Sequence, residues 1–193
     1  MRGKLIVVSG PSGAGKSTLI REVLENVSGI AYSVSATTRA PREGEADGRE
    51  YLFVSREEFE RWISEGRFLE WAEYSGNLYG TPEHPVEEFM DNGRSVILEI
   101  ELKGARKVRE KRPDAVMVFI KAPSEEENRR RLEDRGTETS EAMDSRMETA
   151  AEELSARDEF DYELTNDEPE TSRENMLELM QNIVKGEGSA ERA

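Results

Sequence analysis

One run of residues near the start of the sequence limits the possible folds more than any other feature. Residues 10–17 read G-P-S-G-A-G-K-S, which fits the pattern G-x-x-x-x-G-K-[ST]. The run follows a short apolar stretch, residues 5–8, and precedes residues 17–27, where apolar side chains recur at helical spacing. A glycine-rich turn between a strand and a helix is typical of α/β proteins that bind phosphate groups. The sequence therefore predicts a parallel sheet flanked by helices, with an anion-binding loop after its first strand.

Each residue type in this loop suits the binding of a nucleoside triphosphate. Gly13 and Gly15 let the backbone curl so that successive N–H groups converge on phosphate oxygens. Lys16 is expected to reach the β- and γ-phosphates of ATP, and Ser17 to help hold Mg²⁺. A glycine-rich turn that binds nothing is the alternative, which the flanking strand and helix disfavour. The predicted ATP-binding residues of the loop are Gly10, Pro11, Ser12, Gly13, Ala14, Gly15, Lys16 and Ser17.

Other patterns along the chain support one α/β core. Residues 95–98 and 116–120 are continuous apolar runs, as expected of strands covered by helices on both faces of a parallel sheet. The first run is followed by Glu99, where an acid can hold Mg²⁺ or its waters; the alternative is an acid that meets solvent at the sheet edge. We expect helices at residues 55–66, 103–111, 124–135, 140–157 and 173–184, and further extended segments at residues 32–38, 51–54 and 161–166.

The composition excludes several classes of function. The 193 residues contain 27 Lys and Arg against 42 Asp and Glu, a formal net charge of −15, which disfavours binding to nucleic acid or to an anionic membrane. The chain has no cysteine, so disulfides, thiolate metal sites and cysteine nucleophiles are excluded. No stretch approaches the roughly 20 apolar residues of a membrane span, and we expect a cytoplasmic protein. The sequence leaves the oligomeric state open.

A second anion site is predicted in residues 35–51, which read S-A-T-T-R-A-P-R-E-G-E-A-D-G-R-E-Y. Arg39 and Arg42 lie three residues apart in this turn-rich segment, and Tyr51 follows them. A guanidinium group can bind a phosphate through two parallel hydrogen bonds, and a tyrosine hydroxyl adds a neutral donor. Two solvated loop arginines are the alternative. The pattern favours a second substrate that carries a monophosphate.

At these residues the sequence resembles the guanylate kinase family. Three patterns occur in order: S-x-T-T-R-x-P-R-x-G-E-x-x-G-x-x-Y from residue 35, F-x-E-W-A-x-x-x-G-x-x-Y-G-T from residue 68 and R-G-T-E-T from residue 135. The resemblance covers about residues 4–184. It implies a P-loop NTPase-type fold with an inserted module for a nucleoside monophosphate and a helical lid. It also implies an enzyme that transfers the γ-phosphoryl group of ATP to GMP with Mg²⁺.

The resemblance implies roles for individual residues. Glu70 would accept hydrogen bonds from N1–H and the 2-amino group of guanine, two donors that adenine lacks. The family commonly has I-L-D-I-D where residues 97–101 read I-L-E-I-E, so the acids Glu99 and Glu101 are each one methylene longer. Asn166 matches a position close to the adenine of ATP, with a surface-turn asparagine as the alternative. The implied GMP-binding residues are Ser35, Arg39, Arg42, Tyr51, Glu70, Tyr79, Thr81 and Glu101, and the implied catalytic residues are Lys16, Arg39, Arg135 and Arg146.

Several residues are expected to have structural roles only. Arg129 and Arg130 are predicted to pair with nearby glutamates on their own helix. Trp62, Trp71 and Phe68 are predicted to pack in the core of the inserted module. His84, the only histidine, is predicted to lie in a loop or at a helix start rather than to act in catalysis.

Two other interpretations compete with an active guanylate kinase. One is a binding module that has lost catalysis, and the other is a kinase for another acceptor of similar shape. The complete loop motif argues against the first of them, because such modules usually have a degraded loop.

The resemblance also divides the chain into parts. The expected parts are a core of residues 1–34, 83–124 and 158–185, a GMP-binding module of residues 35–82, a lid of residues 125–157 and a flexible tail of residues 186–193.

Overall fold

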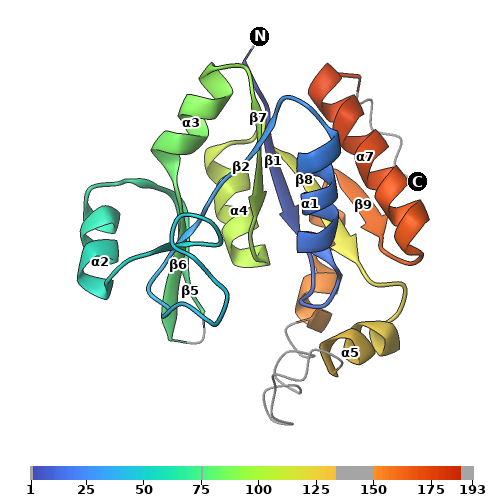
Figure 1. Cartoon of the computed structure of the whole chain (residues 1–193), viewed down its shortest axis with the longest axis horizontal. Coiled ribbons are helices and arrows are strands. Elements are labelled where there is room, and N and C mark those ends of the chain that lie inside the picture. Colours follow the sequence, from blue (N-terminus) through green and yellow to red (C-terminus); the bar gives the residue numbers. More distant parts are fainter. Residues whose placement is uncertain (1, 75, 134–149, 188–193) are drawn as a thin grey trace.

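The computed structural model describes residues 2–74, 76–133 and 150–187, which form an α/β core beside a smaller sheet (Figure 1). Within these ranges the core sheet is parallel throughout, in the order β2-β7-β1-β8-β9. The predicted parallel sheet is thus confirmed, and the strand before the glycine-rich loop lies at its centre. The strands are β1 (Leu5–Ser9), β2 (Ile30–Tyr32), β7 (Ser95–Glu99), β8 (Val116–Lys121) and β9 (Tyr162–Thr165).

Helices cover both faces of the core sheet (Figure 1). β1 is in contact with the helices on both faces. All of its residues are buried, and successive side chains belong to different apolar clusters. Ile6 and Val8 pack with residues of α1 and α7, whereas Leu5 and Val7 pack with residues of α3 and α4. A strand covered on both faces needs the continuous apolar run that the sequence shows. The covering helices are α1 (Lys16–Asn26), α3 (Glu83–Asp91), α4 (Leu102–Lys111) and α7 (Pro169–Lys185).

A second sheet is formed by strands between residues 36 and 82, in the order β4-β3-β6-β5. The helix α2 begins where the sequence predicts, because the Oγ of Ser55 accepts a hydrogen bond from the backbone N–H of Glu58 at 3.1 Å. Phe59 of this helix stacks on Phe68, with ring centroids 4.4 Å apart, and gives the sheet its own small core. The elements are β3 (Ala36–Thr37), β4 (Leu52–Phe53), α2 (Arg56–Ser64), β5 (Phe68–Tyr74) and β6 (Asn77–Pro82).

The prediction that Trp71 packs in this core is wrong. Trp71 lies on β5 but is 36% exposed, and the ammonium group of Lys107 lies 4.9 Å from the centroid of its ring. Phe68, on the same strand, is buried, and Trp62 packs against the cluster as predicted. The pairing of β5 with β6 shifts its register between Phe68 and Glu70, which interrupts the alternation of faces along the strand, and Trp71 beyond the shift is not part of the cluster that holds Phe68.

The helix α5 (Glu125–Glu133) follows β8 and opens the segment predicted to form a lid. Glu127 accepts hydrogen bonds from the side chains of Arg130 and Arg131, so the predicted pairing of Arg130 within its own helix is confirmed. Residues 150–155 are helical, and a 3-10 turn, Arg157–Glu159, leads into β9. Arg135 and Arg146, predicted to be catalytic, lie outside the described residues.

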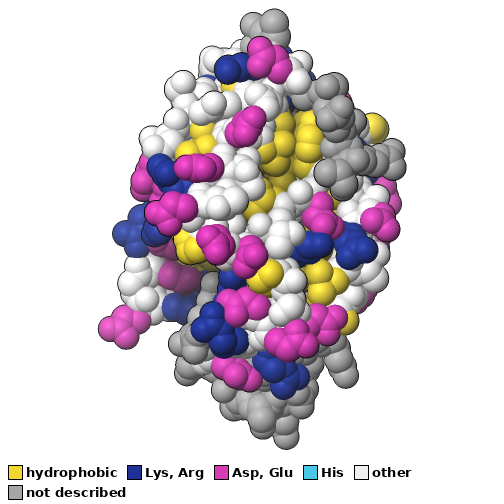
Figure 2. Space-filling model, turned by 90° about the vertical axis from the view of Figure 1, so that its right-hand side faces the viewer, with side chains coloured by type: hydrophobic (Ala, Val, Ile, Leu, Met, Phe, Trp, Pro, Cys, Tyr) yellow, Lys and Arg dark blue, Asp and Glu magenta, His cyan; other side chains and the backbone are white. Residues whose placement is uncertain are grey.

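Charged side chains of both signs are spread over one face of the molecule (Figure 2). On the side shown in Figure 2, acidic side chains are scattered among basic ones, without a broad basic patch among the residues described there. No helix in the described ranges combines the length and the apolar character needed to span a bilayer. His84 lies in the first turn of α3, with its side chain 90% exposed, as expected of a helix-start residue.

Candidate active site

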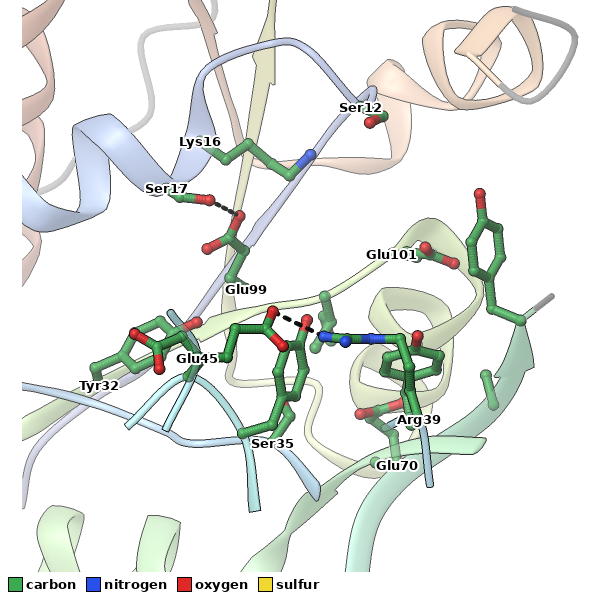
Figure 3. Close-up of a pocket in the computed structure, with 18 of the residues that line it drawn as sticks. Ser12, Lys16, Ser17, Tyr32, Ser35, Arg39, Glu45, Glu70, Glu99 and Glu101 are labelled. Atoms are coloured by element: carbon green, nitrogen blue, oxygen red, sulfur yellow. Dashed lines mark hydrogen bonds and ion pairs between the residues drawn. The ribbon is translucent and has the colours of Figure 1, made fainter. Parts of the chain in front are cut away.

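A cavity of about 530 Å³ is lined by residues of both sheets and of the loop after β1 (Figure 3). Because β1 and β7 are parallel, their carboxyl ends meet at the same edge of the sheet, which brings the loop and Glu99 together. Pro11, Gly13, Ala14, Gly15, Thr81 and Asn166 are not among its lining residues. The predicted site residues that line the cavity are Gly10, Ser12, Lys16, Ser17, Ser35, Arg39, Arg42, Tyr51, Glu70, Tyr79, Glu99 and Glu101.

The loop after β1 has a backbone shape that requires glycine. At Gly10 the φ angle is +136°, and a Cβ atom there would lie 1.9 Å from the carbonyl oxygen of Ile120 on β8. At Gly15 the φ angle is +87°, and a Cβ atom would lie 2.2 Å from Nδ2 of Asn166. Any other residue at either position would force the loop away from its neighbours.

Two side chains hold this loop in place. Asn166 donates from Nδ2 to the carbonyl oxygen of Ala14 at 2.8 Å, so it is attached to the loop rather than free in a surface turn. Lys16 folds back, and its Nζ donates to the carbonyl oxygens of Gly10 at 2.5 Å and of Pro11 at 3.0 Å. The ammonium group therefore already lies inside the loop, where phosphate oxygens can take over from these carbonyls as its acceptors.

Ser17 and Glu99 place two oxygen ligands side by side beneath the loop. The hydroxyl of Ser17 donates to Oε1 of Glu99 at 2.8 Å (Figure 3). In the described ranges no three or more His, Cys, Asp or Glu side chains form a group that could hold a metal by themselves. Mg²⁺ commonly takes only one or two protein ligands and completes its octahedron with water and substrate phosphates. The pair thus fits a magnesium ion that is bound together with a phosphate.

Tyr32, which the sequence did not single out, faces Glu99 from the neighbouring strand. In the parallel β2–β7 pairing, Tyr32 is opposite Ile97, and Glu99 lies two residues further along on the same face. Burial and then the charge of Glu99 raise the pKa of the Tyr32 hydroxyl. The hydroxyl therefore stays protonated and can donate to the carboxylate. No sequence motif links Tyr32 to Glu99, and the pairing of β2 with β7 is what places them side by side.

Arg39 lies at the opposite part of the cavity and is held by Glu45 (Figure 3). Its Nη2 atom is 2.9 Å from Oε1 of Glu45, and this hydrogen bond keeps the pKa of the Glu45 carboxyl below its usual value. The guanidinium carbon lies 5.4 Å from the centroid of the Tyr51 ring, which contacts Tyr79 edge-on. Glu45 also accepts from the backbone N–H of Arg42 at 2.7 Å. Glu45 is a site residue that the sequence analysis missed, and an anion on Arg39 must compete with it.

Glu70 presents a buried carboxylate to the cavity. It is 5% exposed, and its Oε1 accepts a hydrogen bond from the hydroxyl of Thr81 at 2.8 Å. A Cβ atom on Gly104 would lie 2.8 Å from Oε2, so α4 can approach this carboxylate only because it has a glycine there. Burial is the main reason why the pKa of Glu70 is raised. When ionised, Glu70 is a strong acceptor in surroundings of low polarity.

Known proteins are similar to this chain over nearly its whole length. The family model described as guanylate kinase matches residues 2–183. The chain belongs to the guanylate kinase family. The guanylate kinase of Rubrobacter xylanophilus is 70% identical over 185 residues, which are 96% of this chain and 97% of that one. The guanylate kinase of Trichodesmium erythraeum is 49% identical over 178 residues, 92% of this chain and 96% of that one. The crystal structure of guanylate kinase from Anaplasma phagocytophilum matches with a TM-score of 0.76 and 38% identity, covering 96% of this chain and 86% of that chain.

In this member of the guanylate kinase family, the cavity also contains an acid that the sequence analysis missed. Glu153 follows the undescribed segment 134–149, is 7% exposed and lines the cavity together with Lys16 and Glu101. Burial raises the pKa of Glu153 to about 7; the charges of Glu101 and Glu152 add to the rise, and Lys16 and the N–H of Leu102 oppose it. Above neutral pH this carboxylate is ionised in a place that disfavours its charge.

Replacing Glu153 with glutamine is therefore expected to stabilise the fold at alkaline pH. The folded pKa of about 7 lies above the ordinary value of 4.5, so ionisation of Glu153 destabilises the folded state as the pH rises through this window. At pH 8 the variant should have a free energy of unfolding about 3 kcal/mol higher, and near pH 4.5 no difference should remain. Urea unfolding at both pH values measures this. Equal stabilities at pH 8 would contradict the burial of a charged Glu153.

Proposed function

We propose that this chain transfers the γ-phosphoryl group of ATP to GMP, giving ADP and GDP, with Mg²⁺ and in the cytoplasm. The observation that carries the proposal is that one cavity contains Lys16 and the Ser17–Glu99 pair at one part and Arg39 and Glu70 at the other. A kinase needs these two halves within one space, because the donor phosphate and the acceptor phosphate must meet. Membership of the guanylate kinase family supports the same reaction.

The loop half is proposed to bind ATP. Backbone N–H groups of residues 10–17 and the N-terminus of α1 would surround the phosphates, and Lys16 would exchange its carbonyl acceptors for the β- and γ-phosphates. Asn166 would keep the loop in shape near the adenine. Ser17 and Glu99 would hold Mg²⁺, which would offset the negative charge of the phosphates.

The other half is proposed to bind GMP. Arg39 would release Glu45 and grip the monophosphate, and ring hydroxyls of the tyrosines beside it would add neutral donors. Glu70, oriented by Thr81, would accept from N1–H and the 2-amino group of guanine. The proposed phosphate ligands are Ser35, Arg39, Arg42, Tyr51 and Tyr79, and the proposed guanine ligands are Glu70, Thr81 and Glu101.

No strong general base is required, because the attacking group is already a phosphate oxyanion. Catalysis then consists of positioning the two phosphates in line and of stabilising the charge on the group that moves. Lys16 and Arg39 would supply positive charge from the described part of the cavity. Arg135 and Arg146 are proposed to add to it from the segment outside the described residues.

A product analysis by ³¹P NMR tests the proposal. The protein is incubated with ATP, GMP and Mg²⁺, and we expect the β-phosphate signal of GDP to appear together with ADP. Omission of GMP should leave ATP intact, and addition of excess EDTA should abolish the reaction. Folded protein that forms no GDP would refute the proposed function and would favour a binding module without catalysis.

The affinity for GMP is expected to fall at acidic pH because of Glu70. Burial raises the pKa of Glu70 above 4.5, so the group becomes protonated at pH values where an exposed glutamate is still ionised. A protonated Glu70 can no longer accept both guanine donors, and the KM for GMP should rise as the pH is lowered from neutral into the acidic range. The phosphate of GMP titrates near pH 6 and Glu153 of the same cavity near pH 7, so the Glu70→Gln variant, which keeps both effects and lacks only the titration of Glu70, is the control. Identical pH profiles of KM for the two proteins would contradict this prediction.

A further inference from the structure

Asn128 is a buried amide without a hydrogen-bond partner. It lies in the middle of α5 and is 3% exposed. Neither its Nδ2 nor its Oδ1 forms a hydrogen bond with any part of the chain that the structure describes. Most buried polar side chains in proteins are hydrogen-bonded, because a buried donor or acceptor that is left unpaired costs folding free energy. The packing of α5 alone does not explain why a polar side chain is buried at this position without a partner.

The side chain of Asn128 is packed directly against the phosphate-binding loop. A Cβ atom on Gly13 would lie 3.0 Å from Oδ1 of Asn128 and 3.1 Å from Cγ of Leu132. Gly13 has a φ angle of +89°, so at this point the loop needs glycine both for its backbone shape and for the approach of α5. Figure 1 shows α5 beside the loop that joins β1 to α1. An apolar side chain such as the neighbouring Leu132 would fill this position without an unpaired amide.

A second asparagine shows what such an amide does for this loop. Asn166, which follows β9, donates to the carbonyl oxygen of Ala14 at 2.8 Å and so attaches the loop to the end of this strand. Asn128 lies against the preceding residue, Gly13, and offers the same two donors and one acceptor. The loop is thus flanked by two side-chain amides, of which one is hydrogen-bonded to its backbone and the other is poised beside it.

We propose that Asn128 is a positioning residue for the donor nucleotide, hydrogen-bonding to the loop backbone at Gly13 when the loop closes around the phosphates. The proposal rests on the binding of ATP at this loop. Wrapping a loop around a triphosphate turns its N–H groups toward the phosphate oxygens, and each such rotation of a peptide group also moves a carbonyl oxygen. The amide of Asn128 can pair with either backbone group. Binding of the donor then removes an unpaired buried amide, and α5 becomes attached to the loop.

This role gives Asn128 opposite effects on stability and on donor affinity. In the free protein the unpaired amide destabilises the fold, so its removal should raise the melting temperature. In the complex the same amide contributes a hydrogen bond, so its removal should weaken ATP binding. A residue that only packs α5 against the loop would change both quantities in the same direction or would leave the affinity unchanged. The combination of a more stable protein and a weaker donor complex is therefore specific to the proposed role.

The test replaces Asn128 with leucine, which has the same number and branching of side-chain heavy atoms and no polar atoms. Calorimetry measures the Kd of Mg²⁺–AMP-PNP, a non-hydrolysable ATP analogue, and separately the Kd of GMP. We expect the Kd of the analogue to rise about tenfold, equivalent to about 1.4 kcal/mol, while the Kd of GMP stays unchanged and the melting temperature of the free protein rises. Asn128→Ala, which removes the amide without adding bulk, is the second variant and should show the same loss of affinity.

Trp62→Phe provides the matched control. The indole Nε1 of Trp62 is another buried donor without a partner in the described structure, but it lies on α2, in the small core beside the second sheet. Its removal should leave the Kd of the analogue unchanged. An unchanged Kd in both Asn128 variants, measured with a parent protein that binds the analogue, would overturn the inference and leave the proposed function intact. A parent protein that does not bind the analogue would overturn both.

Discussion

Replacing Lys16 with methionine is expected to lower kcat about a thousand-fold without disturbing the fold. Methionine keeps most of the length of the side chain but lacks the ammonium group, which lies within the loop on the carbonyl oxygens of Gly10 and Pro11. In the proposed reaction this charge is needed most when the γ-phosphoryl group moves. Its removal should raise the activation barrier by about 4 kcal/mol, as for other groups that stabilise transition-state charge. The carbonyl oxygen of Pro11 still accepts a hydrogen bond from the backbone N–H of Ala14 at 3.1 Å, which keeps this turn of the loop closed in the variant.

A coupled assay for ADP release, run with saturating ATP and GMP, measures this loss. Lys103→Met is the control, because Lys103 is an exposed residue of α4. The control should keep the parent kcat, and both variants should unfold at about the parent temperature. A decrease of less than tenfold in the Lys16 variant would mean that this ammonium group does not stabilise the transferred phosphoryl group.

The second large effect is expected at Glu70. Its replacement with glutamine keeps the shape and the hydrogen bond from Thr81, but one carboxylate oxygen becomes an NH₂ group that faces a donor of guanine. Two donors of the base can then no longer be satisfied together. We expect kcat/KM for GMP to fall about a hundred-fold, equivalent to about 2.7 kcal/mol, which lies in the range for a hydrogen bond to a buried charged group.

The measurement compares kcat/KM for GMP and for AMP in the parent and in the variant. AMP has neither donor, so its kcat/KM should change little, and the preference for GMP should shrink by nearly the full factor. Glu73→Gln is the control, because Glu73 lies on the same strand, β5, with an exposed side chain. A Glu70→Gln variant that keeps the parent preference would show that Glu70 does not read the base.

The core of the fold could be predicted because its signals are local. The central strand β1, the loop and α1 follow one another without interruption, and β7 and β8 are continuous apolar runs. A buried parallel strand must be apolar on both faces, so its composition reveals it. The start of α2 was equally clear, because the hydroxyl of Ser55 and the N–H of Glu58 interact within one turn.

The smaller sheet was harder to predict because it depends on contacts between distant residues. β3 contains only two residues, and its partner in β6 lies about forty residues later in the chain. β5 alternates between buried and exposed positions over only part of its length, which weakens its pattern. The exposure of Trp71 also follows from the pairing of β5 with β6 and not from its own residue type.

The same limit applies to the candidate site. Lys16, Arg39 and Glu70 belong to motifs with fixed spacing, and the structure brings them to one cavity. Tyr32 and Glu153 have no motif, and only the strand register and the packing of the helix after residue 149 place them there. Asn128 is the clearest case of a residue that the sequence does not reveal. It is a polar residue in a highly charged helix, and only the structure shows that it is buried without a hydrogen-bond partner among the described residues.

The acceptor preference of the purified protein shows whether the cavity selects guanine. Initial rates with Mg²⁺–ATP are measured for GMP, dGMP, AMP, UMP and CMP at equal concentrations. The proposed site predicts rapid turnover with GMP and dGMP and a kcat/KM for AMP that is lower by at least about a hundred-fold, because only guanine supplies both donors to Glu70. Equal turnover with GMP and AMP, or no turnover with any acceptor by folded protein, would contradict the account.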